Sequence, residues 1–349
     1  MRRLQSIRDS ELQLRRMTVA IRRTPVNTRK AHKETALSRV PVWLWRALMH
    51  RILPGELHKF NAVPIDTVDY TFDLDYAGDG LREHRLDVVA PHNAERPLPV
   101  YVYFHGGGWT SGDKAPLTKY AASQAEDGMI VVNANYRMAP RFRIKHMLED
   151  GNAVLDWVAR NIVAFGGDPT RIVLGGDSAG GHIAALLAAS AYEPELAAHY
   201  GLEPRVAKEN LRGLVQHCSI ADFSVMFERG FVLSLNFLKM LLPEHGRGLA
   251  LRAASRFMSP IEWLDSGFPP VFVTTSERDY FYRANLNFIA ALRRRSITVD
   301  TLIYDRKRAN THHTWQQDAR HPESQEVYRQ LGAFVRKVAS MPLLTSAAA

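Results

Sequence analysis

The heptapeptide Gly-Gly-Asp-Ser-Ala-Gly-Gly around Ser178 restricts the fold more than any other part of the chain. It lies between the apolar run 171–174, which predicts a short buried strand, and the alanine-rich run 182–189, which predicts a helix. A serine between a strand and a helix sits on a very sharp turn, around which only small residues fit. Gly176 and Gly180 supply them in the spacing Gly-x-Ser-x-Gly. The pattern predicts a nucleophile elbow; a glycine-rich turn that only binds phosphate is the alternative.

The rest of the chain predicts an α/β fold, because apolar runs alternate with helical patterns from residue 99 onward. We expect strands at 99–104, 129–133, 171–174, 214–218, 270–275 and 299–304, helices at 116–127, 146–161, 282–295 and 323–339, and a loop at 165–170. Two antiparallel strands, near residues 68–72 and 86–88, precede this part. The alternation indicates a mostly parallel central sheet that is covered by helices on both faces.

The length of 349 residues suits one large domain that carries a helical cap. We expect the core in residues 61–222 and 259–341. In residues 1–60 we expect basic N-terminal helices that form part of the cap. Residues 223–258 form a dense apolar helical insertion, and long insertions of this kind commonly serve as lids. Residues 342–349 are expected to be a loose tail.

Positive charge is concentrated in residues 1–40, which contain 11 Lys or Arg and three acids, whereas the remaining chain is nearly neutral. The main body therefore lacks the basic face of a nucleic-acid-binding domain, and we expect no nucleic-acid partner. Residues 1–24 combine an apolar helical stripe with arginines, so this helix could lie on an anionic membrane or cover a pocket. No apolar run reaches the roughly 18 residues of a membrane span. We expect a cytoplasmic protein with peripheral membrane contact.

Cys218 is the one cysteine in the sequence, so an intramolecular disulfide is excluded, and its strand-like neighbourhood predicts a buried, inert thiol. A metal site is not expected. The histidines at 312, 313 and 321 lie together in the sequence, but adjacent ring positions on a loop make poor chelate geometry.

A serine hydroxyl becomes a good nucleophile when a base takes its proton and a third group orients that base. In a chain with such an elbow the partners follow in the order Ser, acid, His, each on a loop after a later strand. Asp279 follows the predicted strand 270–275, and His313 follows the last predicted strand. Glu277 is the alternative acid, and His312 is the alternative base.

The run from His105 to Gly108, His-Gly-Gly-Gly, follows another predicted strand. Successive glycines let the backbone approach a substrate closely and point two N–H groups at one spot. Together with the N–H of Ala179 at the start of the next helix, these groups could form an oxyanion hole.

The chain resembles the hormone-sensitive-lipase branch of the α/β-hydrolases over roughly residues 60–340. Four motifs carry the resemblance: His105-Gly-Gly-Gly108, Tyr136-Arg-Met-Ala-Pro140, Phe165-Gly-Gly-Asp-Pro169 and Gly176-Asp-Ser-Ala-Gly-Gly181. The resemblance implies a carboxylic-ester hydrolase without a cofactor and with a cap built from the N-terminal helices and the insertion. It implies Ser178 as nucleophile, Asp279 and His313 as its partners, and Gly107, Gly108 and Ala179 as oxyanion donors.

We therefore expect a serine esterase or lipase that acts through an acyl-enzyme on a small-molecule ester with a lipophilic or short-to-medium acyl group. The predicted pocket wall consists of Trp43, Trp45, Phe231 and Phe237. A homodimer is also expected. Two alternatives remain open: an acyltransferase or amidase that uses the same triad, and a non-catalytic binding protein like the plant gibberellin receptors, which share the fold and lack the triad histidine.

Overall fold

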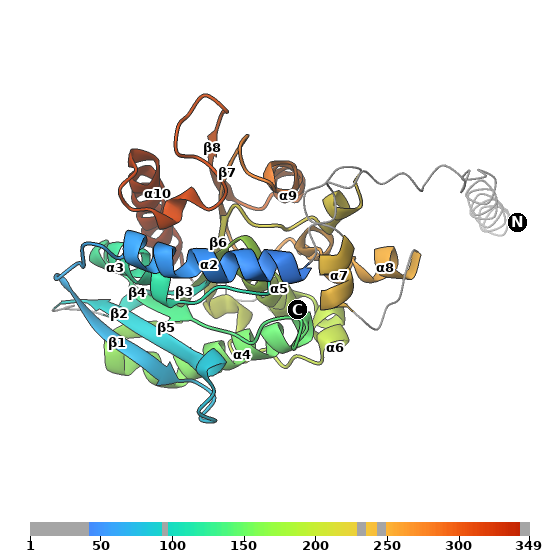
Figure 1. Cartoon of the computed structure of the whole chain (residues 1–349). Coiled ribbons are helices and arrows are strands. Elements are labelled where there is room, and N and C mark those ends of the chain that lie inside the picture. The colour runs from blue at the N-terminus through green and yellow to red at the C-terminus, as the bar shows by residue number, and fades with distance from the viewer. Residues whose placement is uncertain (1–41, 93–96, 229–234, 243–248, 343–349) are drawn as a thin grey trace, which may run out of the picture.

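The computed structural model describes residues 42–92, 97–228, 235–242 and 249–342 (Figure 1). The predicted helix at 1–24, the predicted wall residue Phe231 and almost all of the predicted tail lie outside these ranges.

An eight-stranded sheet forms the centre of the molecule, in the order β1-β2-β4-β3-β5-β6-β7-β8. The strands are β1 Val68–Asp75, β2 Arg85–Pro91, β3 Leu98–Phe104, β4 Ile130–Ala134, β5 Gly167–Asp177, β6 Leu211–His217, β7 Val271–Ser276 and β8 Val299–Tyr304. β1 and β2 pair antiparallel, and β2 pairs antiparallel with β4. The other strands are parallel to their neighbours. The predicted fold class is confirmed.

Helices cover both faces of the sheet (Figure 1). They are α2 Val42–Phe60, α3 Thr118–Glu126, α4 Ile144–Asn161, α5 Ser178–Tyr192, α6 Pro194–Tyr200, α7 Leu235–Leu241, α8 Leu249–Ala254, α9 Tyr282–Arg294 and α10 Pro322–Ser340. Side chains of α3 and α10 belong to the hydrophobic core on one face, and side chains of α4, α5 and α9 belong to the core on the other.

The alternation of β3 shows how the sequence builds these two cores. Val102 and Phe104 point into the core under α4 and α5, whereas Tyr101 and Tyr103 point into the core under α3 and α10. All four are almost completely buried, as expected for a central strand whose successive side chains alternate between covered faces. Burial of an apolar side chain such as Val102 or Phe104 contributes about 1.5–3 kcal/mol relative to exposure.

The predicted loop at 165–170 is wrong for its last four residues, because β5 begins at Gly167. The backbone N–H of Leu98 donates to Gly166 O at 2.9 Å, and Leu98 pairs with Gly167 across the sheet. A register shift then separates this pair from the regular pairing that starts at Val100 and Ile172. Pairing with β3 thus extends the strand through residues that look like a turn in isolation.

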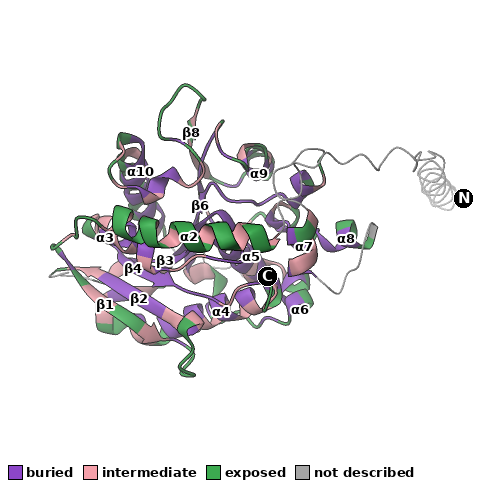
Figure 2. Cartoon of the chain, in the orientation of Figure 1, coloured by how far each residue is buried: buried purple, intermediate pink, exposed green. Residues whose placement is uncertain are grey.

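Helix α2 crosses the outside of the molecule, and its outward side is exposed (Figures 1 and 2). Leu44, Leu48 and Ile52 are spaced four residues apart and are 46%, 50% and 38% exposed. They form the outer stripe of α2. The C-terminal end of α2 is held by Lys59, whose ammonium lies 3.1 Å from the carboxylate of Asp318. None of the helices in the described part of the chain is long and apolar enough to cross a lipid bilayer.

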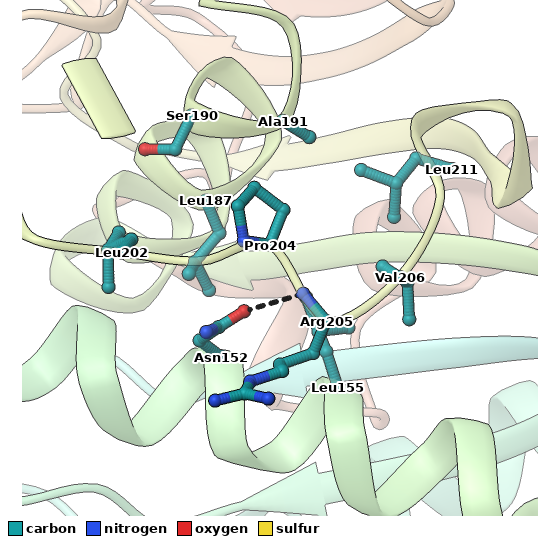
Figure 3. Close-up of a pocket in the computed structure, with 10 residues that line it drawn as sticks. All are labelled: Asn152, Leu155, Leu187, Ser190, Ala191, Leu202, Pro204, Arg205, Val206 and Leu211. Carbon is teal, nitrogen blue, oxygen red and sulfur yellow. Dashed lines mark hydrogen bonds between the residues drawn. The ribbon is translucent and has the colours of Figure 1, made fainter. Parts of the chain in front are cut away.

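A small cavity between α4, α5 and the segment leading into β6 has a volume of about 10 Å³ (Figure 3). Its polar edge is a hydrogen bond in which the backbone N–H of Arg205 donates to Asn152 Oδ1 at 3.2 Å. Apolar side chains, among them Leu155 and Leu187, fill most of its wall. This volume accepts about one water molecule and is too small for an organic ligand.

A partly buried ionic cluster anchors the segment after β4. The guanidinium of Arg137 contacts the carboxylate of Asp150 at 2.6 Å, and His84 lies between Asp150 and Asp79 at 3.2 and 2.7 Å. The neighbouring Tyr136 hydroxyl donates to His105 O at 2.8 Å, so this cluster supports the loop that begins at His105.

The pKa of His84 is raised, chiefly by the hydrogen bond to Asp150 and against the opposing effect of burial. A histidine with a raised pKa in the folded state stabilises the fold at low pH, and this contribution is lost as the pH rises through the folded-state pKa. We therefore expect His84→Gln to lower the free energy of unfolding more at pH 6 than at pH 9. Urea unfolding at both pH values measures this difference; an equal loss at both would contradict the charged state of His84.

Candidate active site

Ser178 stands at the junction of β5 and α5 with a backbone φ of 50°, a left-handed conformation that is unusual for serine. The glycines around it are required by space. A Cβ on Gly180 would lie 2.0 Å from Phe104 O, and one on Gly176 would lie 2.5 Å from the carbonyl carbon of Gly180. The local geometry is the strained strand-turn-helix that the Gly-x-Ser-x-Gly spacing predicts.

The structure brings Ser178, Asp279 and His313 together. His313 Nε2 lies 3.0 Å from Ser178 Oγ, and His313 Nδ1 lies 2.7 Å from Asp279 Oδ1. Because the carboxylate can only accept, Nδ1 carries the proton and Nε2 is free to accept the serine proton. The serine follows β5, the aspartate follows β7 and the histidine follows β8. Because these strands are parallel members of one sheet, their carboxyl ends lie at the same edge and bring the three residues together.

The alternative acid and base point elsewhere. Glu277 is exposed and accepts a hydrogen bond from the backbone N–H of Arg306 at 2.9 Å. His312 is also exposed, and its Nε2 lies 3.4 Å from Arg278 Nη1. Neither side chain is paired with Ser178 or with the other members of the site.

Two buried side chains that the sequence did not single out hold Asp279. Thr275 Oγ1 donates to Asp279 Oδ2 at 2.7 Å, and Asn285 Nδ2 lies 3.4 Å from the same oxygen. The backbone N–H of Phe281 donates to Oδ1 at 3.1 Å. Thr275 lies near the end of a predicted strand and Asn285 in a predicted helix, and no motif marks either one. Their role depends on how β7 and α9 pack.

The loop after β3 adopts a backbone conformation that requires glycine. Gly107 and Gly108 have φ values of 123° and 61°, and a Cβ on Gly107 would lie 1.9 Å from Ser111 O. Among the hydrogen bonds between described residues, none takes the backbone N–H of Gly107 or Gly108 as donor. The N–H of Ala179 belongs to the first turn of α5, where helical N–H groups lack intrahelical acceptors. Backbone N–H groups without an acceptor can stabilise negative charge, as the predicted oxyanion hole requires.

Asp177, the residue before the serine, ties this loop to the rest of the site. Its Oδ1 accepts from Tyr103 Oη at 2.6 Å and from the backbone N–H of Gly106 at 3.0 Å. Its Oδ2 accepts from Gln317 Nε2 at 3.0 Å, four residues beyond His313. Burial raises the pKa of Asp177 to about 6, and the hydrogen bonds oppose this shift. The carboxylate thus links the elbow, the glycine loop and the histidine loop.

His182 connects the glycine loop to the end of the insertion. Trp109 Nε1 donates to His182 Nδ1 at 3.1 Å, and His182 Nε2 then donates to Met258 O at 2.7 Å. Phe223, at the start of the insertion, lies 4.6 Å from the imidazole, centroid to centroid. Burial lowers the pKa of His182 to about 3, so the ring is neutral and keeps both bonds near neutral pH.

Of the predicted wall residues, Trp45 and Phe237 lie together beside the glycine loop. Their ring centroids are 6.2 Å apart, and Trp45 Nε1 would lie 2.9 Å from a Cβ on Gly108. Trp43 does not join this wall, because it is 69% exposed. Helical residues two positions apart point to nearly opposite sides, so Trp43 and Trp45 cannot share one face of α2.

Comparison with known proteins places the chain among related hydrolases. A family model described as α/β hydrolase fold matches residues 101–314. The carboxylesterase NlhH of Mycobacterium tuberculosis is 33% identical over 209 residues, which cover 58% of this chain and 62% of the relative. The esterase LipQ of the same organism is 32% identical over 247 residues, which cover 65% of this chain and 51% of the relative. The chain thus spans between half and two thirds of these curated relatives.

Solved structures share the fold at lower identity. Esterase B of Lactobacillus rhamnosis superposes with a TM-score of 0.75 at 20% identity, and covers 84% of this chain and 94% of its own. An esterase of the archaeon Pyrobaculum calidifontis gives a TM-score of 0.63 at 22% identity, with 85% and 94% covered. The family match extends over more than half of the chain and includes the elbow, the glycine loop and the loops that carry Asp279 and His313. The chain therefore belongs to the hormone-sensitive-lipase-like family of α/β-hydrolases.

Proposed function

We propose that this protein is a serine carboxylic-ester hydrolase that acts on small-molecule lipophilic esters through an acyl-enzyme. The observation that carries the proposal is the chain of contacts from Ser178 Oγ through His313 to Asp279, at 3.0 and 2.7 Å. The N–H groups of Gly107 and Gly108 add to it, because they donate to no other residue that the structure describes. The names of the relatives, carboxylesterase and esterase, support the same reaction.

In this mechanism His313 Nε2 takes the hydroxyl proton of Ser178 while the serine oxygen attacks the ester carbonyl. The N–H groups of Gly107, Gly108 and Ala179 stabilise the oxyanion, and each such donor is worth about 2.7–4 kcal/mol in comparable sites. Asp279 holds the imidazolium. The histidine then returns the proton to the departing alkoxide, and water attacks the acyl-enzyme by the same route to release the carboxylic acid and free Ser178.

The proposal is tested with a series of p-nitrophenyl esters of two to sixteen acyl carbons, together with a fluorophosphonate that reacts with activated serines. We expect hydrolysis and a single covalent adduct, which peptide mass spectrometry locates on Ser178. Absence of both would favour a non-catalytic binding protein. A Ser178 adduct without ester hydrolysis would favour an acyltransferase or amidase, and added alcohols or amides would then separate these two.

The paired rings of Trp45 and Phe237 are proposed to limit the depth of the acyl pocket. Phe237 is fully buried against the core. Replacing it with alanine removes a ring from the wall, so we expect Phe237→Ala to shift the preferred acyl chain toward longer esters. The ester series measures the shift as kcat/KM against chain length. Trp43→Ala is the matched control, because Trp43 is an exposed aromatic residue on α2, the helix that carries Trp45; an identical shift in both variants would contradict the proposed wall.

We also propose that the protein is cytoplasmic and that it contacts anionic membranes through residues 1–24 and the outer stripe of α2. The stripe of Leu44, Leu48 and Ile52 is exposed, and residues 1–40 carry a strong positive charge. Full-length protein should sediment with phosphatidylserine vesicles at low salt, and a 1–24 deletion should bind less. Equal, salt-independent sedimentation of both forms would contradict this contact. We further propose the expected homodimer, which light scattering on the vesicle-free protein tests.

A further inference from the structure

A thiol lies beside the acid and base of the candidate site. One ligand atom each from Cys218, Asp279 and His313 lies within 4.8 Å of the other two. In the part of the chain that the structure describes, no other three side chains with sulfur, imidazole or carboxylate ligands come this close together. The mechanism above makes no use of the thiol.

The topology of the sheet explains this position. Cys218 directly follows β6, which lies between β5, the strand that leads to Ser178, and β7, the strand that leads to Asp279. Its backbone has a φ of 46°, and its N–H donates to Thr274 O at 2.9 Å. The thiol is completely buried. It therefore lies close to the Asp279–His313 pair and away from solvent.

We propose that Cys218, Asp279 and His313 form an inhibitory binding site for a thiophilic divalent cation such as Zn²⁺ or Cd²⁺. Thiolate, imidazole and carboxylate are the three ligand types that proteins use for zinc. In a tetrahedral zinc site neighbouring ligand atoms lie about 3.5 Å apart. The present separations of at most 4.8 Å therefore require side-chain movements of about 1 Å. A fourth position is left for water.

The ring nitrogen that faces Asp279 is Nδ1, which carries a proton in the metal-free site. When the cation binds Nδ1, the ring keeps one proton, on Nε2, and the Cys218 thiol releases one proton to solvent. The balance is one cation bound and one proton released. Nε2 is then a donor and cannot take the proton of Ser178. On the proposed function, this change of tautomer stops acyl transfer without blocking the pocket.

The only member of this site that reaches solvent is the histidine, whose side chain is 18% exposed, whereas the Asp279 side chain is fully buried. A cation must therefore enter past the His313 ring. The ligand types make the site selective. Zn²⁺ and Cd²⁺ bind sulfur ligands well, whereas Mg²⁺ prefers oxygen ligands and loses its hydration water reluctantly.

Binding is measured first, in the Ser178→Ala protein, so that the result is independent of catalysis. Titration with Cd²⁺ should produce the ultraviolet charge-transfer absorption of a cadmium thiolate, with one cation per chain. The double variant Ser178→Ala/Cys218→Ser should lack this absorption. Absorption that is absent in the first protein, or unchanged in the second, would overturn the proposed site. Because no turnover is involved, this result stands even if the esterase proposal fails.

Inhibition is measured next with the active protein. Zn²⁺ should abolish p-nitrophenyl ester hydrolysis, EDTA should restore it, and Mg²⁺ should have no effect. Cys218→Ser should retain hydrolysis without metal and require at least about 10-fold more Zn²⁺ for the same inhibition. Cys218→Ala serves in its place should the serine variant fold poorly. His312→Gln is the matched control for adventitious binding at an exposed histidine; loss of inhibition in this variant but not in Cys218→Ser would overturn the inference.

Discussion

Ser178→Ala and His313→Ala are each expected to lower kcat for p-nitrophenyl ester hydrolysis about 10⁶-fold, the size of effect found when the nucleophile or base of a serine hydrolase is removed. The alanine at position 178 has no oxygen to acylate. The alanine at position 313 removes His313 Nε2, which lies 3.0 Å from Ser178 Oγ and accepts its proton in the proposed mechanism. The residual rate should reflect only substrate binding and the oxyanion donors.

The two substitutions remove parts of one unit, so the double variant should be no slower than either single variant. His312→Ala is the matched control, because this neighbouring imidazole is exposed and points toward Arg278. It should keep kcat within a few-fold of the unmodified protein. A large loss in His312→Ala, with activity retained in His313→Ala, would assign the base to the other histidine. Circular dichroism of all four proteins establishes that they are folded.

Asp279→Asn is expected to lower kcat about 10⁴-fold with little change in KM, as in other triads in which the acid becomes an amide. The amide cannot hold a positive charge on His313 as a carboxylate does. It also stabilises the tautomer that carries the proton on Nε2, facing Ser178, where the base must accept. The hydrogen bond that Thr275 now donates to Asp279 Oδ2 can be kept by the amide oxygen, so the fold should survive.

Steady-state kinetics from pH 6 to pH 10 measure this prediction, because a wrong tautomer predicts partial recovery of kcat at high pH, where hydroxide can assist. A merely structural loss would instead lower the free energy of unfolding and affect all pH values equally. Glu277→Gln is the matched control, since this exposed carboxylate pairs with the backbone of Arg306. Equal kinetic effects at positions 277 and 279 would contradict the assignment of the acid.

Short-range patterns were sufficient for the fold. Gly176 and Gly180 predict the elbow because steric limits at a sharp turn act on the nearest residues, and the alternation of apolar runs with helical patterns predicts a parallel sheet because burial on both faces requires it. The same reasoning failed at residues 167–170, where pairing with β3 extends a strand through a segment rich in turn residues.

Choices between neighbours required the tertiary structure. His313 is the base predicted from the sequence and His312 its alternative, and only the path of the loop after β8 turns one ring toward Ser178 and the other toward Arg278. Trp43 and Trp45 are equally apolar, but the rotation of α2 exposes the first and places the second beside Gly108. Periodicity indicates that a helix has an apolar face, but not which part of that face meets the core.

The sequence by itself determined which chemistry to propose for this protein: it has a serine in an elbow motif, an acid and a histidine in the required order, and a glycine run that is predicted to stabilise negative charge. Only the tertiary structure decided what surrounds these groups. Asp177 accepts a hydrogen bond from Gln317, and the Cys218 thiol lies close to the Asp279–His313 pair. The physical reason is that such contacts join residues more than 30 positions apart, and their distances follow from strand order and loop path, which no local pattern encodes.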